Sequence, residues 1–343
     1  MNVRPAFHVH VSGSAGTSLC QWAYKQSPIN VAGNAYACFL PCKGNLEFRQ
    51  ELTAYSPSKK CRAMYSSCAN LESEMKKRRY HVIGMAETFL PEIGRALPRS
   101  FDSCPDKKCC VCNSLAINDR PYFCAIKEEH KTLKLRALQV EKGQISPLEA
   151  KFPVHAMRSP KTFCPNIAYT FLMNDPVKRI VSMLATKCAG CVNTSKIAEC
   201  AAYILDDIEK RHLIVDIADG TYMMGTAAVN NYNIRMLLGP ATFFAGIQMI
   251  STKHLQVAKR MLQRFTIISP VQNLSNLGPV LHKTLNWTSL GKIVSNRHKN
   301  TKSRKVIYNR LAPRIRLLNS YDIALYEFVK HEFNNNFPKY FIT

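Results

Sequence analysis

The sequence predicts an α/β fold in which a parallel sheet is covered by helices on both faces. Three observations predict it. A short apolar stretch at 7–11 leads into a turn of small residues and then into a helical segment at 17–25. A second apolar stretch at 166–173 ends in Asn174-Asp175-Pro176, a typical helix start because proline fits the first helical turn. After it, helix and strand patterns alternate toward the end of the chain.

The elements follow in order from the spacing of apolar residues. The helix expected at 177–185 directs Ile180, Val181 and Leu184 inward. Further helices are predicted at 198–211, 231–238, 253–264, 278–285 and 319–333, with a strand at 265–269. Residues 38–150 are rich in Cys, Lys and Arg, and we expect insertions and loops there, with core pieces at 81–84 and 121–126. The polar stretch 291–304 is predicted to be a basic loop.

The charge of the chain is strongly positive. Lys and Arg number 47 against 23 Asp and Glu, a formal net charge of +24. Such a surface attracts nucleic acid, acidic membranes, phosphorylated cofactors or polyanionic glycans, and charge alone does not choose among them. Hydrophobic content is ordinary for a globular protein, so nothing in it indicates wholesale disorder. No run reaches the ~18 apolar residues of a membrane span, and no signal-peptide pattern opens the chain, so we expect a soluble protein.

The 14 cysteines are clustered. Groups lie at 38/42, 104–112 and 188/191, which favours disulfides in a secreted or lumenal protein, whereas in the cytosol the 104–112 group is a candidate zinc site. We expect disulfides, because no second CxxC or HxxxH lies at finger-like spacing. Three N-x-[ST] sequons, at Asn193, Asn273 and Asn286, are compatible with lumenal exposure, although chance produces this triplet often.

The segment with the most chemistry is the turn at 12–18. Its small residues let backbone N–H groups point into one concavity, and the helix that follows presents the positive end of its dipole. It lacks the Lys of a Walker A motif and the G-x-G-x-x-G of a dinucleotide site. A turn of this kind between strand and helix is also compatible with a purely structural role.

Five segments resemble sulfotransferases, in the order that family has them. Residues 10–19 resemble the loop H-[IV]-P-K-[ST]-G-G-T-[ST]-L, which binds the 5′-phosphosulfate of 3′-phosphoadenosine-5′-phosphosulfate. Residues 174–182 resemble the signature R-D-P-V-x-R-x-x-S, which binds its 3′-phosphate. Residues 230–237, 258–287 and 318–326 resemble the later blocks D-N-x-x-x-R-x-L, A-K…L…F…W and N…D-x-x-L-Y. The chain is similar to Golgi carbohydrate sulfotransferases of the heparan sulfate 2-O- and 6-O- type.

The resemblance implies a P-loop-NTPase-like sheet in a single domain over 1–343, with a variable Cys-rich and basic insertion at 38–150. It implies transfer of a sulfonate group from 3′-phosphoadenosine-5′-phosphosulfate to a hydroxyl of a neutral or anionic glycan, without a metal. His155 stands where glycan sulfotransferases carry a candidate base, and imidazole suits proton transfer near neutral pH. An ordinary surface or core histidine is the alternative. The resemblance further implies donor binding by Ser12, Gly13, Ser14, Ala15, Gly16, Thr17, Ser18, Asn174, Ser182, Lys302 and Arg304, and acceptor binding by Arg158 and Arg235.

Two departures leave alternatives open. Gly13 stands at the loop lysine and Asn174 at the arginine that clamps the 3′-phosphate, so flanking cations such as Arg158, Lys161, Lys178 and Arg179 are candidates to compensate. The main alternative is a degenerate member that binds donor or anionic glycan without turnover. The hypothesis of a nucleic-acid-binding protein rests on charge alone, since no helix-turn-helix, RNP or finger pattern is present. Nucleic acid is therefore not expected as a partner. A nucleoside-phosphate kinase lacks its P-loop lysine here.

Localisation is implied by the same resemblance. Relatives of this type are lumenal Golgi proteins with an N-terminal membrane anchor, and the cysteines and sequons favour the same compartment. This sequence shows no such anchor, and we expect membrane association only through one. A soluble protein, cytoplasmic or secreted, is the alternative.

Overall fold

The structure is a computed structural model of the 343-residue chain. It describes residues 3–10, 14, 16–25, 29, 68–86, 163–188, 194–210, 229–238, 242, 250–287, 293 and 301–336. The fold described below is built from these residues.

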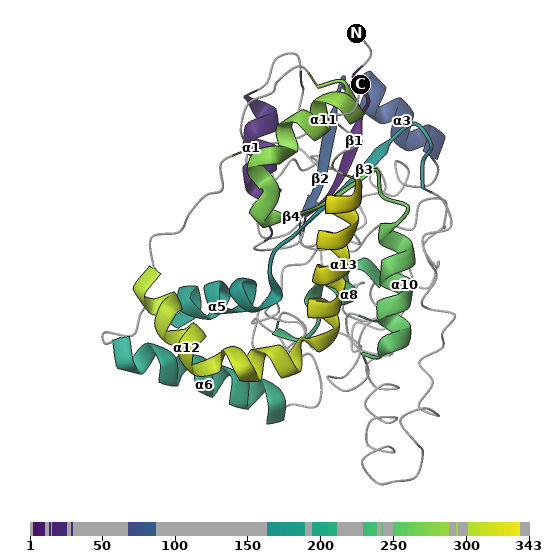
Figure 1. The fold of residues 1–343 in the computed structure, drawn as a ribbon. Coiled ribbons are helices and arrows are strands. Elements are labelled where there is room, and N and C mark those ends of the chain that lie inside the picture. The colour runs from purple at the N-terminus through teal and green to yellow at the C-terminus, as the bar shows by residue number, and fades with distance from the viewer. Residues whose placement is uncertain are drawn as a thin grey trace, which may run out of the picture.

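Four parallel strands form the central sheet (Figure 1). They are β1 (Ala6–His10), β2 (Val82–Ala86), β3 (Ala168–Met173) and β4 (Ile267–Pro270), in the spatial order β2-β1-β3-β4. Every residue of β3 is buried, which explains why its sequence is nearly continuous in apolar residues instead of alternating. The predicted α/β class, with a parallel sheet, is confirmed.

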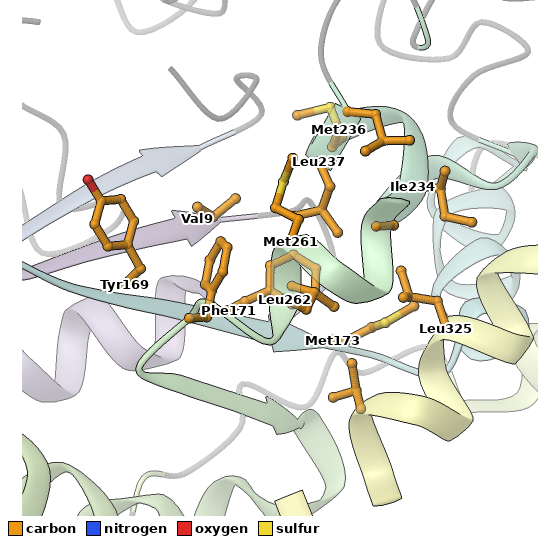
Figure 2. Packing of buried hydrophobic residues seen from close by; sticks show 14 of the residues in the cluster. Val9, Tyr169, Phe171, Met173, Ile234, Met236, Leu237, Met261, Leu262 and Leu325 are labelled. Atoms are coloured by element: carbon orange, nitrogen blue, oxygen red, sulfur yellow. The ribbon is translucent and has the colours of Figure 1, made fainter. Parts of the chain in front are cut away.

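Helices cover both faces of the sheet, because successive side chains of a strand point to opposite faces. Phe7, Val9 and Phe171 lie on the face covered by α3 (Cys68–Lys77), α8 (Tyr232–Leu238), α10 (Thr252–Leu262) and α13 (Ser320–Asn336). Figure 2 shows this larger core, where Phe171, Leu262 and Leu325 come from three different elements. The other face is covered by α1 (Gly16–Tyr24), the 3-10 helix η9 (Val271–Asn276) and α11 (Leu277–Leu285).

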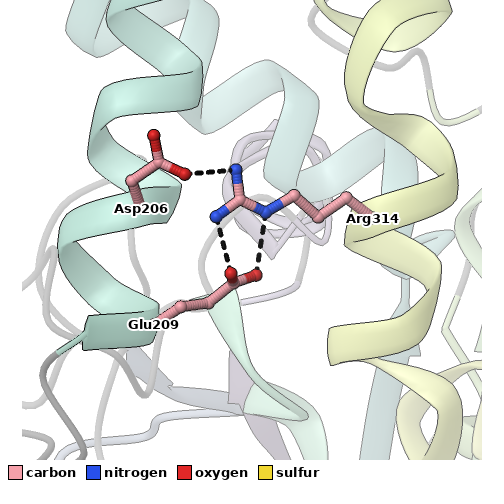
Figure 3. A network of polar contacts seen from close by, with 3 residues as sticks. All are labelled: Asp206, Glu209 and Arg314. Carbon is pink, nitrogen blue, oxygen red and sulfur yellow. Dashed lines mark hydrogen bonds and ion pairs between the residues drawn. The ribbon is translucent and has the colours of Figure 1, made fainter.

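A third group of helices follows the carboxyl end of β3 and has a core of its own (Figure 1). It contains α5 (Pro176–Lys187), α6 (Thr194–Lys210) and α12 (Thr301–Leu318), with Ile180, Leu205 and Ile315 among its buried residues. Arg314 of α12 binds two carboxylates of α6, at 2.7 Å to Asp206 and 2.6 Å to Glu209 (Figure 3). A disulfide between Cys188 and Cys200 joins the end of α5 to α6.

Most of the predicted elements match the structure to within a few residues, and two predictions are wrong. The loop predicted at 291–304 is helical from Thr301 onward. Residues 68–77, expected to be a loop in the insertion, form α3. The core piece expected at 81–84 is confirmed as strand β2, so part of 38–150 belongs to the central sheet. The core piece expected at 121–126 and the cysteines at 104–112 lie outside the described residues.

The prediction that cysteines of the chain form disulfides is confirmed. Cys68 of α3 is bonded to Cys164, just before β3, and Cys188 is bonded to Cys200. The neighbour of Cys188 in sequence, Cys191, is therefore not its partner. The bonds join elements that are adjacent in space, since bridging requires Cα atoms within about 7 Å of each other.

Candidate functional site

The candidate site lies where β1 and β3 end. Because the strands are parallel and adjacent, their carboxyl ends meet at one edge of the sheet. Ser14 follows β1 and Asn174 follows β3, and the backbone N–H of Asn174 donates to the Oγ of Ser14 at 3.4 Å. Ser14 is buried and Asn174 is half-buried. The structure thus joins the two segments, 160 residues apart, that the sequence singled out for donor binding.

The strand order makes this edge a favourable place for a ligand. From β1 the chain passes to β2 on one side of the sheet, and β3 then lies on the other side of β1. In open parallel sheets, ligands bind outside the carboxyl ends of the strands where the winding direction reverses. In the order β2-β1-β3-β4 that point lies between β1 and β3, which is where Ser14 meets Asn174.

The loop residues are described in part. Helix α1 begins at Gly16, so the positive end of its dipole lies at this edge, where it favours an anion. Ser18 is buried within that turn. Ser12, Gly13 and Ala15 lie outside the described residues, as does the side chain of Thr17.

The start of α5 is arranged differently. The carboxylate of Asp175 caps the helix and accepts from the backbone N–H of Val177 at 2.9 Å and of Lys178 at 3.1 Å. These first-turn donors are therefore already occupied, and an anion beside α5 depends on side chains. Lys178 is exposed and Ser182 is half-buried. They are four residues apart and share one face of the helix.

A buried polar pair lies beneath the edge, on the face covered by α1. His8 and Thr170 are opposite each other in the β1–β3 register, and His8 Nδ1 lies 2.9 Å from Thr170 Oγ1. Both side chains are buried. Sequence reasoning missed this pair, because the partner of His8 is set by strand register across 162 residues.

Helix α13 contributes a further group that sequence reasoning did not assign. The Tyr326 hydroxyl donates to Gln272 Oε1, directly after β4, at 2.8 Å. Burial raises the pKa of Tyr326 to about 12, and the negative charges of Asp175 and Glu327 add to the shift. This phenol therefore stays protonated at neutral pH and serves as a hydrogen-bond donor.

Arg235 occupies a different place from the one expected of an acceptor-binding residue. It is fully buried, and its guanidinium donates to the carbonyl oxygens of Asn230 at 2.6 Å and Thr242 at 3.0 Å, and to Asn230 Oδ1 at 2.6 Å. Burial lowers its pKa to about 9, and the charge of Asp322 opposes that shift, so the group stays cationic at neutral pH. These contacts give it a structural role, and nothing in them supports acceptor binding, which stays a prediction.

The late basic residues are helical. Lys302 and Arg304 lie in the first turn of α12, with Lys302 exposed and Arg304 half-buried. The Nε of Arg304 is buried, and within the described part of the chain it has no hydrogen-bond partner. A buried guanidinium nitrogen that lacks a hydrogen-bond partner among the described residues favours binding of an acceptor such as phosphate. His155 and Arg158, the predicted base and acceptor contact, lie outside the described residues.

The described residues contain neither a cluster of metal-ligand side chains nor a membrane-spanning helix. Among the ranges that the structure describes, no three side chains of His, Cys, Asp or Glu gather as metal ligands would. The described helices include none with the length and apolar character needed to cross a bilayer.

Comparisons of the chain with models of protein families, with curated proteins and with solved structures found no match. The assignment of a function therefore depends on the geometry of the sheet edge and on the sequence signatures that meet there.

Proposed function

We propose that the chain is a sulfotransferase with a P-loop-like arrangement, which moves a sulfonate group from 3′-phosphoadenosine-5′-phosphosulfate to a hydroxyl of a glycan. One observation carries the proposal. The contact between Ser14 and Asn174 brings the segment that resembles a 5′-phosphosulfate loop beside the segment that resembles a 3′-phosphate signature. Both lie at the point of the sheet where ligands of parallel α/β proteins bind.

The described residues fit the two phosphate ends of the donor. The 5′ end is held by the N–H groups at the start of α1, whose dipole favours negative charge, together with Ser18. The 3′-phosphate is held by the side chains of Asn174 and Ser182, because Asp175 already occupies the N–H groups at the start of α5. Arg304, whose Nε is buried, is the further cation that the resemblance assigns to donor binding.

The chemistry then needs a base. Transfer forms a bond between the acceptor oxygen and sulfur and breaks the bond between sulfur and the phosphate oxygen. The proton of the acceptor hydroxyl passes to His155, and the bisphosphate leaves with the negative charge. Donors aimed at that leaving oxygen stabilise the transition state, and losing one costs about 10²–10³ in rate.

The two departures from the family pattern reduce that stabilisation. With Gly13 for lysine and Asn174 for arginine, two charge-assisted contacts are missing, each contributing roughly 1.5–3 kcal/mol. Arg179 does not replace them, because it is buried and its guanidinium lies 4.6 Å from the ring centre of Tyr232. Lys178, exposed on the same face of α5 as Ser182, is better placed. We therefore expect slow turnover.

A transfer assay with labelled donor and a panel of glycans tests the proposal. The expected result is acceptor-dependent transfer that His155→Ala abolishes, while affinity for adenosine 3′,5′-bisphosphate is kept. His331→Ala, an exposed histidine of α13, is the matched control and leaves transfer unchanged. Bisphosphate binding without turnover on any acceptor would establish the degenerate alternative instead, for which Gly13 and Asn174 are the motivation.

The disulfides Cys68–Cys164 and Cys188–Cys200 support a place in an oxidising compartment, and we propose the Golgi lumen. There a glycan is the natural acceptor, and nucleic acid is not an expected partner. Fractionation of expressing cells, followed by protease treatment of intact vesicles, checks this. We expect the protein to be protected from protease in intact vesicles and digested once detergent is added. Digestion without detergent would contradict a lumenal location.

A further inference from the structure

Helix α12 has an unusual charge composition. Its 18 residues include six cations, namely Lys302, Arg304, Lys305, Arg310, Arg314 and Arg316, and no Asp or Glu. Helix α5, which packs against it, also has no acidic residue within its bounds. The two helices therefore form a strongly basic part of the molecule.

The cations of α12 are divided between two sides of the helix. Ile307, Leu311 and Ile315, spaced four apart, are buried against α5 and α6. The opposite face is exposed and presents Lys302, Lys305, Asn309, Arg310, Pro313, Arg316 and Leu317. From Lys302 to Arg316 this face extends about 21 Å along the helix axis, at 1.5 Å per residue.

The carboxylates of α6 do not neutralise that face. Asp206 and Glu209 bind Arg314, which points toward α6 (Figure 3). Within the described residues, none of the four exposed cations Lys302, Lys305, Arg310 and Arg316 has a carboxylate partner. Arg316 donates instead to the neutral hydroxyl of Tyr308 at 3.1 Å. The positive charge of the face is therefore available to a ligand.

We infer that the exposed face of α12 is a binding surface for an acidic polysaccharide. Four cations distributed over 21 Å match the repeating charges of a polymer better than a single ion, and their summed field attracts it at long range. The disulfides favour an oxidising compartment, where sulfated or carboxylated glycans are available and nucleic acid is not the expected polyanion. An anionic membrane is less well matched, because Leu317 is the single apolar side chain on this face besides Pro313.

The surface goes beyond the proposed function and does not depend on it. Lys302 is one of the predicted donor residues, whereas Lys305, Arg310 and Arg316 are not among them. A polysaccharide bound there stays bound whether or not the chain transfers sulfonate.

Fluorescence anisotropy with size-fractionated, labelled heparin tests the inference, with the wild-type chain at several salt concentrations. Lys305→Gln/Arg310→Gln/Arg316→Gln removes three exposed charges without touching the donor residues. We expect its affinity at 0.1 M salt to fall about tenfold or more and its salt dependence to become shallower. The matched control, Lys76→Gln/Lys77→Gln/Lys253→Gln, removes three exposed cations from α3 and α10 and changes affinity less than about threefold.

Two further arms keep the result decisive. A charge-preserving variant, Lys305→Arg/Arg310→Lys/Arg316→Lys, retains wild-type affinity if charge on this face is what binds. A single-stranded oligonucleotide and phosphatidylserine vesicles are offered as competing polyanions. The inference is overturned if heparin does not bind, if both triple-Gln variants lose affinity equally, or if the oligonucleotide or the vesicles bind more tightly than heparin.

Discussion

At the scale of single residues, Asp322 of α13 organises the interior next to the sheet. Its carboxylate accepts from the backbone N–H groups of Asn233 at 2.9 Å and Ile234 at 3.0 Å, and from Asn233 Nδ2 at 2.7 Å. A buried aspartate of one helix thus caps another, α8, which has only seven residues and needs its end satisfied. Burial raises the pKa of Asp322, and the hydrogen bonds from Asn233 and Ile234 oppose that shift.

Removing this carboxylate should destabilise the protein strongly. We expect Asp322→Ala to lower the free energy of unfolding by roughly 3–5 kcal/mol, because it leaves three donors buried without an acceptor and removes a counter-charge from Arg235. Denaturant unfolding checks this. Glu327→Ala, the loss of an exposed carboxylate from the same helix, is the control and costs less than about 1 kcal/mol. Equal losses in the two variants would contradict the capping role.

His254 of α10 is a second residue whose environment sets its charge. Its Nδ1 accepts from the backbone N–H of Ser251 at 3.2 Å, which fixes the neutral ring with its proton on Nε2. Burial lowers its pKa to about 4, and the positive charges of Arg235 and Lys253 add to this. The folded state therefore binds the proton less readily than the unfolded chain does.

The sign of the pH dependence follows. The pKa is lower in the folded state than the ordinary 6.5, so the stability linked to His254 is complete above pH 6.5 and is lost as the pH falls toward 4. As the pH falls from 6.5 toward 4, we expect the unfolding free energy of the wild type to fall by on the order of 3 kcal/mol more than that of His254→Gln. Unfolding curves at pH 7 and pH 4.5 check this, and a parallel decline of the two proteins would rule it out.

At the scale of elements, the predictable ones have a clear apolar pattern or a strong start signal. The strand ending at Met173 and the helix after Pro176 follow directly from buried residues and an aspartate cap. Helix α12 was missed because its cations conceal the spacing of Ile307, Leu311 and Ile315, and because Pro313 argues against a helix. Helix α3 was missed since only Leu71 and Met75 anchor it in the core.

The candidate site was predictable to a similar extent. The meeting of Ser14 and Asn174 follows from two strand–loop–helix segments whose strands are parallel neighbours. The burial of Arg179 and Arg235 does not follow, because a cation in a basic chain is normally a surface residue and only tertiary packing encloses it. The pairing of His8 with Thr170 depends on register in the same way.

The disulfides connect separate elements and should matter for stability. Cys68–Cys164 closes a separation of 96 residues between α3 and the start of β3. We expect Cys68→Ser/Cys164→Ser to lose about 2–4 kcal/mol of unfolding free energy. The Cys188–Cys200 bond closes a separation of only 12 residues, so Cys188→Ser/Cys200→Ser should lose less unfolding free energy. Peptide mapping of the non-reduced protein must also recover Cys188 linked to Cys200; a link to Cys191 would contradict the structure.

At the scale of the whole molecule, the candidate ligand site and the basic helix α12 both lie beyond the carboxyl end of β3. The order β2-β1-β3-β4 creates the switch point where Ser14 and Asn174 meet. The helices α5, α6 and α12 lie beyond the carboxyl end of β3 (Figure 1). The cations Lys302, Lys305, Arg310 and Arg316 of α12 are exposed, on the side opposite the residues that pack against α5 and α6. A donor with several phosphates and an anionic polymer would thus both be attracted to this part of the molecule.

The most direct test of this account is a calorimetric titration with adenosine 3′,5′-bisphosphate. We expect saturable one-to-one binding that Ser182→Ala weakens about tenfold or more, through loss of a hydrogen bond to a charged phosphate. Ser275→Ala, an exposed serine of η9, leaves the affinity unchanged. Absence of saturable binding, or an equal response to the two substitutions, would contradict a donor site between β1 and β3.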